Sequence, residues 1–406
     1  MWLPKDIAEI LERFHAAGTE AYVVGGAVRD SLMGKDPADF DIATAALPEQ
    51  VKNLFRDHRI IETGIRHGTV TLLWGETAVE ITTFRTESGY SDFRRPDRVC
   101  FSASIREDLS RRDFTVNAVC YSPDTGYYDP FGGMADIKRR LLRTVGDPNE
   151  RFCEDALRIL RVLRFAAVLG FEIESETASA AVSLRGLLCS ISAERIMAEL
   201  KKLLAGRFAP EVLNAYFVIF AAALPPLAEY AETALDFLPL RGCPKQSDAV
   251  RLSAFLLCAA KNAKKAAALA EPVMRFLKSD NRLRKEVCLL TEMFSAPVPA
   301  DKTDLKHLLQ RMEPRQAEEL FCLWEAFEIC DGLKTQALRQ TLTEITESRQ
   351  CFRLCELAVT GEDLLAEGLR PKEIGAALQM LLNAVIDEAC ENETGSLLAF
   401  LRQSRA

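Results

Sequence analysis

The sequence predicts an α+β protein in which a small α/β segment at the N-terminus is followed by helices. Runs rich in β-branched and aromatic residues, such as 69–74 and 78–84, are concentrated before residue 145. After Gly146-Asp147-Pro148 the strand signals almost disappear, and apolar residues recur at helical spacing. A chain of 406 residues has room for two to four domains of roughly 100–200 residues each.

The composition is that of an ordinary globular protein. Hydrophobic residues make up 48% of the chain and charged residues 27%, and no apolar run approaches the ~20 residues that span a bilayer. The N-terminus lacks the basic and apolar regions of a signal peptide, and none of the twelve cysteines belongs to a CxxC pair. We therefore expect a cytoplasmic protein without disulfides or membrane contact. None of the four histidines precedes an aspartate, which argues against a His-Asp phosphohydrolase site.

The charge is unevenly distributed along the chain. The net charge of −8 argues against a protein that coats RNA. From Lys138 to Arg164, however, the chain carries eight Lys or Arg residues and four Asp or Glu residues, a local charge of +4. We expect the phosphates of RNA and nucleotides to bind near this segment.

The first chemical motif follows a predicted helix over residues 6–17 that ends at Gly18. An apolar run ends in Gly25-Gly26, and a stretch compatible with a helix follows. Because glycine lacks a Cβ, the backbone can turn sharply there and a ligand can approach its N–H groups. The amides at the start of the helix suit a phosphate, and Arg29 adds a forked positive charge.

Two carboxylates, Asp39 and Asp41, come next at alternate positions of a strand-like segment. Alternate side chains on a strand share a face, and paired carboxylates beside a phosphate cradle are typical ligands of Mg²⁺. Each motif alone is usually a turn or a solvated loop. Together, in this order and spacing, they resemble the nucleotidyltransferase superfamily that includes DNA polymerase β. The resemblance implies that Asp39 and Asp41 are catalytic and bind metal, and that Gly26 and Arg29 bind nucleotide phosphates.

The β-rich runs at 69–74 and 78–84 are joined by Gly75-Glu76 and predict a hairpin. Glu80, on the second run, either projects toward the aspartate pair as a third carboxylate or lies in solvent. Residues 85–110 then form a polar stretch of little periodicity, which predicts a long loop of functional importance.

The second chemical motif is Arg111-Arg112-Asp113, followed by Phe-Thr-Val-Asn-Ala. A bare Arg-Arg-Asp is usually surface charge, but this continuation makes the motif specific. Paired arginines suit a triphosphate, so we assign Arg112 to nucleotide binding. Asp113 is a candidate reader of a ribose hydroxyl.

Residues 151–165 predict one amphipathic helix with a basic stripe. Arg158, Arg161 and Arg164 recur at every third position, and Asp155 lies one turn before Arg158. Cytosine and adenine each present an amino donor beside a ring-nitrogen acceptor, so a carboxylate and a guanidinium together can read both bases. The alternative is a solvated helix face held by an Asp155–Arg158 ion pair.

With the chain length, these motifs narrow the resemblance to the class II tRNA nucleotidyltransferases, which are the CCA-adding enzymes, and to bacterial poly(A) polymerases. The resemblance implies a polymerase-β-like head followed by an elongated, all-helical neck, body and tail. It assigns base reading to Asp155 and Arg158, nucleotide contacts to Arg161 and Arg164, and the switch from C to A addition to the polar loop. A further helix at 191–204 resembles the neck element that supports the base-reading helix. The expected domains are a catalytic head at 1–145, a neck at 146–206, a body at 207–320 and a tRNA-binding tail at 321–406.

We therefore expect template-independent addition of CCA to the 3′ end of tRNA from CTP and ATP, with Mg²⁺ as cofactor and no obligate protein partner. Poly(A) polymerases usually carry a Gly-Arg-Arg-Phe-like stretch where this chain has residues 63–68, which places that alternative second. An enzyme that adds only the terminal A is another alternative. A catalytically silent tRNA-binding factor is the last, and the intact Asp39, Asp41 and Arg29 argue against it.

Overall fold

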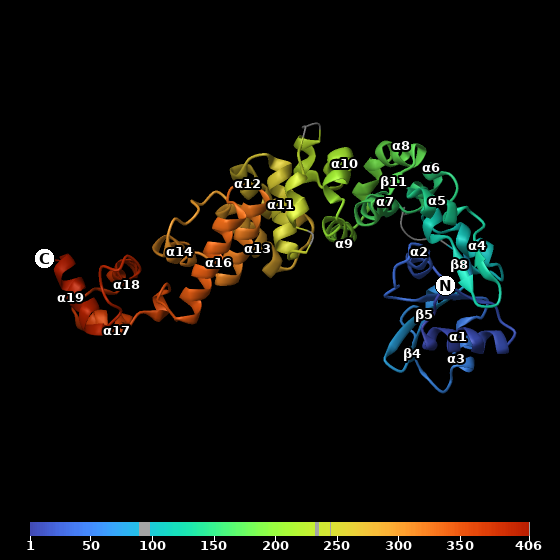
Figure 1. Ribbon diagram of the computed structural model, residues 1–406, viewed down its shortest axis with the longest axis horizontal. Coiled ribbons are helices and arrows are strands. Elements are labelled where there is room, and N and C mark those ends of the chain that lie inside the picture. Colours follow the sequence, from blue (N-terminus) through green and yellow to red (C-terminus); the bar gives the residue numbers. More distant parts are fainter. Residues whose placement is uncertain (89–97, 232–234, 244, 406) are drawn as a thin grey trace. The chain divides into compact units, whose positions relative to one another are not determined.

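The computed structural model describes residues 1–88, 98–231, 235–243 and 245–405 (Figure 1). The chain forms two compact units. The first runs from Met1 to Ala234 and includes Phe276–Lys278, and the second comprises the remaining residues. A mixed sheet lies in the first unit and helices follow it, so the predicted α+β class is confirmed. The finer division into head, neck, body and tail remains a prediction.

A seven-stranded mixed sheet organises the N-terminal part of the first unit. Its strands lie in the order β3-β4-β5-β2-β1-β8-β9, with β2 and β5 parallel to each other. The predicted hairpin is confirmed, because β4 and β5 pair up to Trp74 and Thr77 across a two-residue turn. The strands are β1 (Ala21–Val24), β2 (Asp41–Thr44), β3 (Arg59–Ile61), β4 (Thr69–Trp74), β5 (Thr77–Thr83), β8 (Cys120–Ser122) and β9 (Gly126–Tyr128).

Apolar residues fill both faces of this sheet. Along β1, Val23 belongs to one core cluster and Val24 to the other, because successive side chains point to opposite faces. The first face packs against α1 (Lys5–Ala16), which confirms the predicted N-terminal helix, and against α3 (Pro48–Leu54). The second face packs against α4 (Ile105–Ser110). The sheet is therefore buried on both sides, and its strand ends are free to carry polar groups.

The expectation of an aperiodic loop over residues 85–110 is wrong at both ends. Strands β6 (Arg85–Ser88) and β7 (Arg98–Phe101) form an antiparallel ribbon, and helix α4 follows. Among the described residues this ribbon pairs with no other strand, and such a pair needs no alternation of apolar residues that a sequence could reveal. Residues 89–97, which belong to the proposed switching loop, lie outside the described residues.

The predicted continuous helix over residues 151–165 is also wrong. Helix α6 (Pro148–Glu154) ends at Asp155, and α7 (Leu157–Leu169) begins two residues later. Asp155 has an extended backbone, and its Oδ1 accepts a hydrogen bond from the N–H of Leu157 at 3.1 Å. An aspartate that caps a nearby N–H in this way competes with the helix ladder. The break places Asp155 at the junction of two helices.

The rest of the first unit is almost entirely helical. Helix α9 (Ala193–Leu204), which confirms the predicted helix near 191–204, packs along α7. One exception to the expected all-helical neck is β11 (Glu172–Ile173), which pairs in parallel with β10 (Leu141–Leu142). The remaining helices are α2 (Gly26–Leu32), α5 (Gly133–Arg139), α8 (Ser175–Ser183) and α10 (Ala209–Ala223).

The second unit contains helices and no strand among its described residues. The indole of Trp324 is fully buried, and its Nε1 donates to the carbonyl oxygen of Phe294 at 3.0 Å. Within the described ranges, no helix combines the length and apolarity needed to cross a membrane. The helices of this region are α11 (Asp248–Ala260), α12 (Ala263–Phe276), α13 (Asn281–Met293), α14 (Lys302–Leu309), α15 (Pro314–Ala326), α16 (Gly332–Glu347), α17 (Gly361–Ala366), α18 (Pro371–Ile386) and α19 (Thr394–Arg405).

Candidate active site

Three carboxylates lie near one end of the sheet. Asp41 opens β2 and is paired in register with Glu80 of β5, so both side chains project from the same face. Asp39 lies two residues before Asp41, outside the strand. Burial, and next the negative charge of Glu80, raise the pKa of Asp41, and Asp39 adds to this effect. Glu80 and Asp39 are thus both close enough to act on Asp41.

This donor set suits a divalent cation. Mg²⁺ is usually held by one or two carboxylates, with the remaining positions filled by water and substrate phosphates. Across the described ranges, no three His, Cys, Asp or Glu side chains are arranged to hold a metal by themselves. The residues therefore fit an ion whose coordination sphere is completed by substrate oxygens.

Arg112 lies against the glycine turn that opens α2. Gly25 has a φ of 72°, in the left-handed region that favours glycine, and a Cβ there would lie 3.3 Å from Nη1 of Arg112. Nη2 of Arg112 donates to Asp108 at 3.2 Å. Its buried Nε has no hydrogen-bond partner among the described residues. Arg112 and Gly25 line the same cavity, so a guanidinium held beside this turn is suited to bind an oxygen of a phosphate.

Asp113 is saturated with hydrogen bonds. Its Oδ1 accepts from the N–H of Phe114 at 2.9 Å and from Nδ2 of Asn117 at 3.1 Å. Its Oδ2 accepts from Nε and Nη2 of Arg161 at 2.9 and 2.5 Å. A carboxylate offers about four acceptor positions, and these four contacts fill them, so no position is left for the ribose hydroxyl that Asp113 was a candidate to read. Burial opposes ionisation, but the charge of Arg161 and these hydrogen bonds outweigh it and lower the pKa of Asp113 to about 2.

Asn117 connects Asp113 to Arg29 through hydrogen bonds to both side chains. Nη1 of Arg29 donates to Oδ1 of Asn117 at 2.8 Å, and its Nε donates to Asp30 at 2.9 Å. The guanidinium also lies 5.3 Å from the ring centroid of Phe165 on α7. Arg29 is therefore held rigidly, with part of its hydrogen-bonding capacity left for a ligand.

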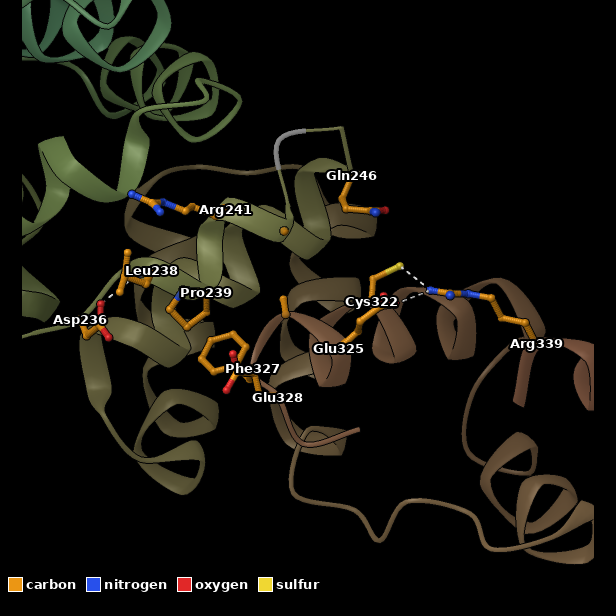
Figure 2. Close-up of a pocket in the computed structure, with 12 residues that line it drawn as sticks. Asp236, Leu238, Pro239, Arg241, Gln246, Cys322, Glu325, Phe327, Glu328 and Arg339 are labelled. Carbon is orange, nitrogen blue, oxygen red and sulfur yellow. Dashed lines mark hydrogen bonds and ion pairs between the residues drawn. The ribbon is translucent and has the colours of Figure 1, made fainter. Parts of the chain in front are cut away.

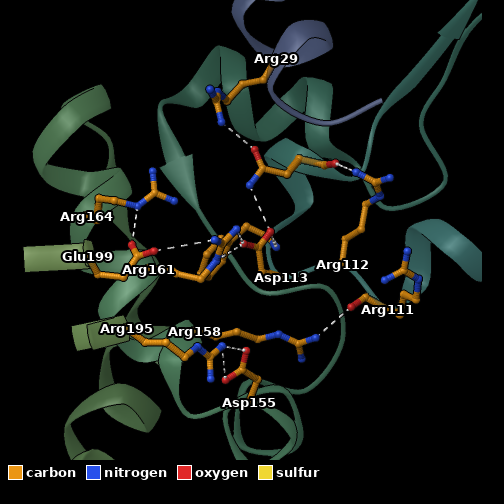
Figure 3. Close-up of polar contacts among 12 residues, drawn as sticks. Arg29, Arg111, Arg112, Asp113, Asp155, Arg158, Arg161, Arg164, Arg195 and Glu199 are labelled. Carbon is orange, nitrogen blue, oxygen red and sulfur yellow. Dashed lines mark hydrogen bonds and ion pairs between the residues drawn. The ribbon is translucent and has the colours of Figure 1, made fainter. Parts of the chain in front are cut away.

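Asp155 pairs with Arg195 of α9 and not with Arg158. Nη2 of Arg195 lies 2.9 and 3.2 Å from the two carboxylate oxygens (Figure 3). Arg158 instead donates to Glu154 at 2.5 Å and to the carbonyl oxygen of Arg111 at 3.0 Å. The alternative of an Asp155–Arg158 ion pair on a solvated helix face is therefore wrong. Both side chains line the same cavity, as the base-reading hypothesis requires.

Arg164 lies beside Arg161, and both contact Glu199 and the ring of Phe165. Its Nε donates to Glu199 of α9 at 2.6 Å, and its guanidinium lies 3.8 Å from the ring centroid of Phe165. These contacts join α7 to α9. The predicted nucleotide contact of Arg164 remains a prediction that no contact in the structure supports.

One cavity of about 430 Å³ collects most of the predicted site. The predicted residues that line it are Gly26, Arg29, Asp41, Arg112, Asp155, Arg158 and Arg161. Asp39 and Arg164 are not among its lining residues. Sequence reasoning did not assign several further lining residues to the site, namely Arg111, Asn117, Leu157, Phe165 and Arg195. Asn117 carried a signal, as part of the second motif, whereas Arg195 lies forty residues from its partner and carried none.

A second cavity, of about 730 Å³, lies in the second unit (Figure 2). Its lining includes Cys322, Glu325 and Arg339, whose polar groups satisfy one another: Nη2 of Arg339 lies 3.6 Å from the sulfur and 3.3 Å from the carboxylate. The residues that line it include no counterpart of the glycine turn with paired carboxylates.

Three family models match the chain. Residues 21–143 match the poly A polymerase head domain, and residues 170–215 match the probable RNA and SrmB-binding site of polymerase A. Residues 246–401 match a model described as tRNA nucleotidyltransferase domain 2, putative. The first match covers the glycine turn, the carboxylates and the paired arginines.

Similarity to known proteins extends over the whole chain. The CCA-adding enzyme of Lactobacillus delbrueckii subsp. bulgaricus is 36% identical over 394 residues, which cover 97% of this chain and 96% of that protein. The CCA-adding enzyme of Leuconostoc citreum is 36% identical over 417 residues, 99% of this chain and 97% of that protein. The chain belongs to the family of CCA-adding enzymes. The predicted family and enzyme class are thereby confirmed, and membership implies dependence on a divalent metal ion.

Solved structures of CCA-adding enzymes share the fold. The Bacillus stearothermophilus enzyme in complex with CTP is 31% identical and superposes with a TM-score of 0.83, covering 99% of this chain and 97% of that one. The Thermotoga maritima enzyme complexed with tRNA is 21% identical with a TM-score of 0.66, covering 100% and 97%. At that lower identity the likeness shows the fold alone.

Proposed function

We propose that this protein adds CCA to the 3′ end of tRNA from CTP and ATP, with Mg²⁺ and without a nucleic-acid template. One observation carries the proposal: a single cavity brings Asp41, the glycine turn, Arg112 and the Asp155–Arg158 motif together. Full-length similarity to CCA-adding enzymes supports the same reaction. A cytoplasmic location is part of this proposal and rests on the sequence features given above.

In this reaction the RNA 3′-hydroxyl attacks the α-phosphorus of the nucleotide, and pyrophosphate leaves. Mg²⁺ bound at Asp39 and Asp41 would supply charge neutralisation and a lower pKa for the hydroxyl. The backbone at Gly26 and the guanidinium of Arg112 hold the triphosphate. Catalysis then comes mainly from positioning and electrostatics.

The base is read by Asp155 and Arg158. Oδ1 of Asp155 accepts from Leu157 and Arg195, whereas Oδ2 accepts only from Arg195 among the contacts described. Oδ2 therefore has a position left for the amino group of cytosine or adenine. Uracil and guanine present the opposite order of donor and acceptor, so both protein charges would be mispaired.

Arg158 has donors left for the ring nitrogen. Its five N–H groups supply three described hydrogen bonds, to the carbonyl oxygens of Arg151 and Arg111 and to Glu154. The guanidinium is thus fixed on one side and able to donate on the other. The pair needs no nucleic-acid template to select between bases.

The test is to incubate the purified protein with tRNA lacking its 3′ end, Mg²⁺, and CTP or ATP singly and together. We expect two C residues with CTP alone, and a complete CCA end with both nucleotides. Addition of A but not C would indicate an A-adding enzyme, and a long A tract would indicate a poly(A) polymerase. No incorporation by folded protein would indicate a binding factor.

A further inference from the structure

Asp108 is a buried carboxylate that the proposed reaction does not use. It lies on α4 with 1% of its surface exposed, and it does not line the cavity itself. Its Oδ1 accepts from Nε and Nη2 of Arg111 at 3.1 and 2.8 Å, and its Oδ2 accepts from Nη2 of Arg112 at 3.2 Å. The N–H of Arg85 lies 3.4 Å from Oδ1, which is a longer contact. One carboxylate thus holds two arginines that both line the cavity.

The charge of Asp108 is maintained by these two partners. Burial by itself raises the pKa of this carboxyl, but the charges and hydrogen bonds of Arg111 and Arg112 outweigh burial and lower it. Two guanidinium groups on consecutive residues repel each other. A shared ionised carboxylate offsets that repulsion and gives each guanidinium a fixed orientation.

The affinity for a phosphate ligand depends on the orientation of the Arg112 guanidinium. Its Nη2 is held by Asp108, and its Nη1 lies beside Gly25 and 3.5 Å from the carbonyl oxygen of Asn117. These contacts leave the buried Nε without a partner among the described residues. If Asp108 did not hold Nη2, the guanidinium could turn away from the glycine turn.

We propose that Asp108 is the positioning residue that holds Arg111 and Arg112 in place for the triphosphate. The identity of the ligand rests on the proposed function. Because Asp108 acts through groups that contact phosphates, its removal should change the affinities for CTP, ATP and pyrophosphate by the same factor. A purely electrostatic role predicts the opposite sign, because loss of a nearby negative charge favours anion binding.

The test is calorimetric binding of pyrophosphate and of CTP to the full-length protein in the presence of Mg²⁺. Asp108→Asn should lower the affinity for both ligands by the same factor, about tenfold, as expected for loss of one charge-assisted contact. Asp108→Glu keeps the charge but displaces it by a methylene, so a smaller loss is expected. The matched control is Asp136→Asn, which removes an equally buried carboxylate paired with Arg143 at 3.0 Å outside the cavity. It should bind both ligands as the wild type does.

Several results would overturn this inference. One is unchanged or tighter binding of the ligands by Asp108→Asn. Another is a loss of affinity for CTP that exceeds the loss of affinity for pyrophosphate. The third is an equal loss of affinity in Asp136→Asn. If Asp108→Asn does not fold by circular dichroism, Asp108→Glu decides, and wild-type binding by that variant overturns the proposal. Wild-type protein that binds pyrophosphate but extends no tRNA would contradict the proposed function alone. Wild-type protein that binds neither pyrophosphate nor CTP would contradict both.

Discussion

Asp155 and Arg195 form an ion pair of 2.9 Å and line the same cavity, although forty residues separate them in the sequence. Arg195 lies on α9, and Glu199, one turn later on the same helix, binds Arg164 of α7. Helix α9 therefore holds the segment of Asp155 and α7 at two points. The carboxylate that is proposed to read the base owes its orientation to a residue outside its own motif.

Removal of the Asp155 side chain should reduce base discrimination more than it reduces the stability of the fold. Hydrogen bonds to charged groups contribute roughly 1.5–3 kcal/mol, so Asp155→Ala should cut the preference for CTP and ATP over UTP and GTP by roughly 10- to 150-fold. The measurement is kcat/KM for each nucleotide on a tRNA that ends before the first C. An unchanged selectivity ratio would contradict the base-reading role.

Removal of Arg195 should act through Asp155. Arg195→Ala leaves the carboxylate in place but unanchored, so we expect a smaller loss of selectivity than in Asp155→Ala. The double variant should lose no more selectivity than Asp155→Ala alone, because the two residues act as one unit. Lys202→Ala, an exposed change on the same helix, is the control and should keep the wild-type ratio. Additive losses in the double variant would show that Arg195 acts independently.

The carboxylates at the end of the sheet should be required for both C and A addition. Asp39→Ala or Asp41→Ala should abolish transfer while leaving tRNA binding largely intact, because RNA affinity comes from basic surface elsewhere. Glu80→Gln should lower the rate less severely, because Glu80 acts on Asp41 through its charge. The control is Glu76→Gln, at the turn of the same hairpin. Folded Asp41→Ala protein with near wild-type activity would exclude the proposed metal site.

Asp113 should stabilise the fold in a pH-dependent way. Its pKa falls from 3.8 to about 2 on folding, which corresponds to roughly 2 kcal/mol of stability. Because the folded pKa is depressed, this contribution is fully present above about pH 4 and is lost as the pH falls toward 2. Urea unfolding should therefore show Asp113→Asn to be less stable at pH 7, with a difference from wild type that shrinks below pH 4. A difference independent of pH would contradict the ionic role.

Gly133 should tolerate no side chain. A Cβ at this position would lie 2.1 Å from the carbonyl oxygen of Thr115 and 2.7 Å from Val119, next to the second motif. Gly133→Ala should therefore destabilise the protein by about 1–3 kcal/mol or more. Gly186→Ala is the matched control, because a Cβ there meets nothing within 4 Å. Equal melting temperatures for the two variants would contradict this expectation.

The sequence by itself determined the features that depend on neighbouring residues. The β-rich runs on either side of Gly75-Glu76 predicted the hairpin, and helical spacing predicted α1 and the helix-rich character of the chain after residue 146. The motifs around Gly25, Arg112 and Asp155 identified seven of the residues that line the cavity. These signals are local, because glycine geometry and the periods of strands and helices act over a few residues.

Only the tertiary structure decided which partners the charged side chains take. The helix break at Asp155, the pairing of that residue with Arg195, and the saturation of Asp113 by Arg161 all depend on hydrogen bonds between elements. Arg161 lies 48 residues from Asp113, and Arg29 lies 88 residues from Asn117. A motif specifies which groups can bond, whereas the packing of α7 and α9 beside the sheet end brings one particular partner within reach of each charge.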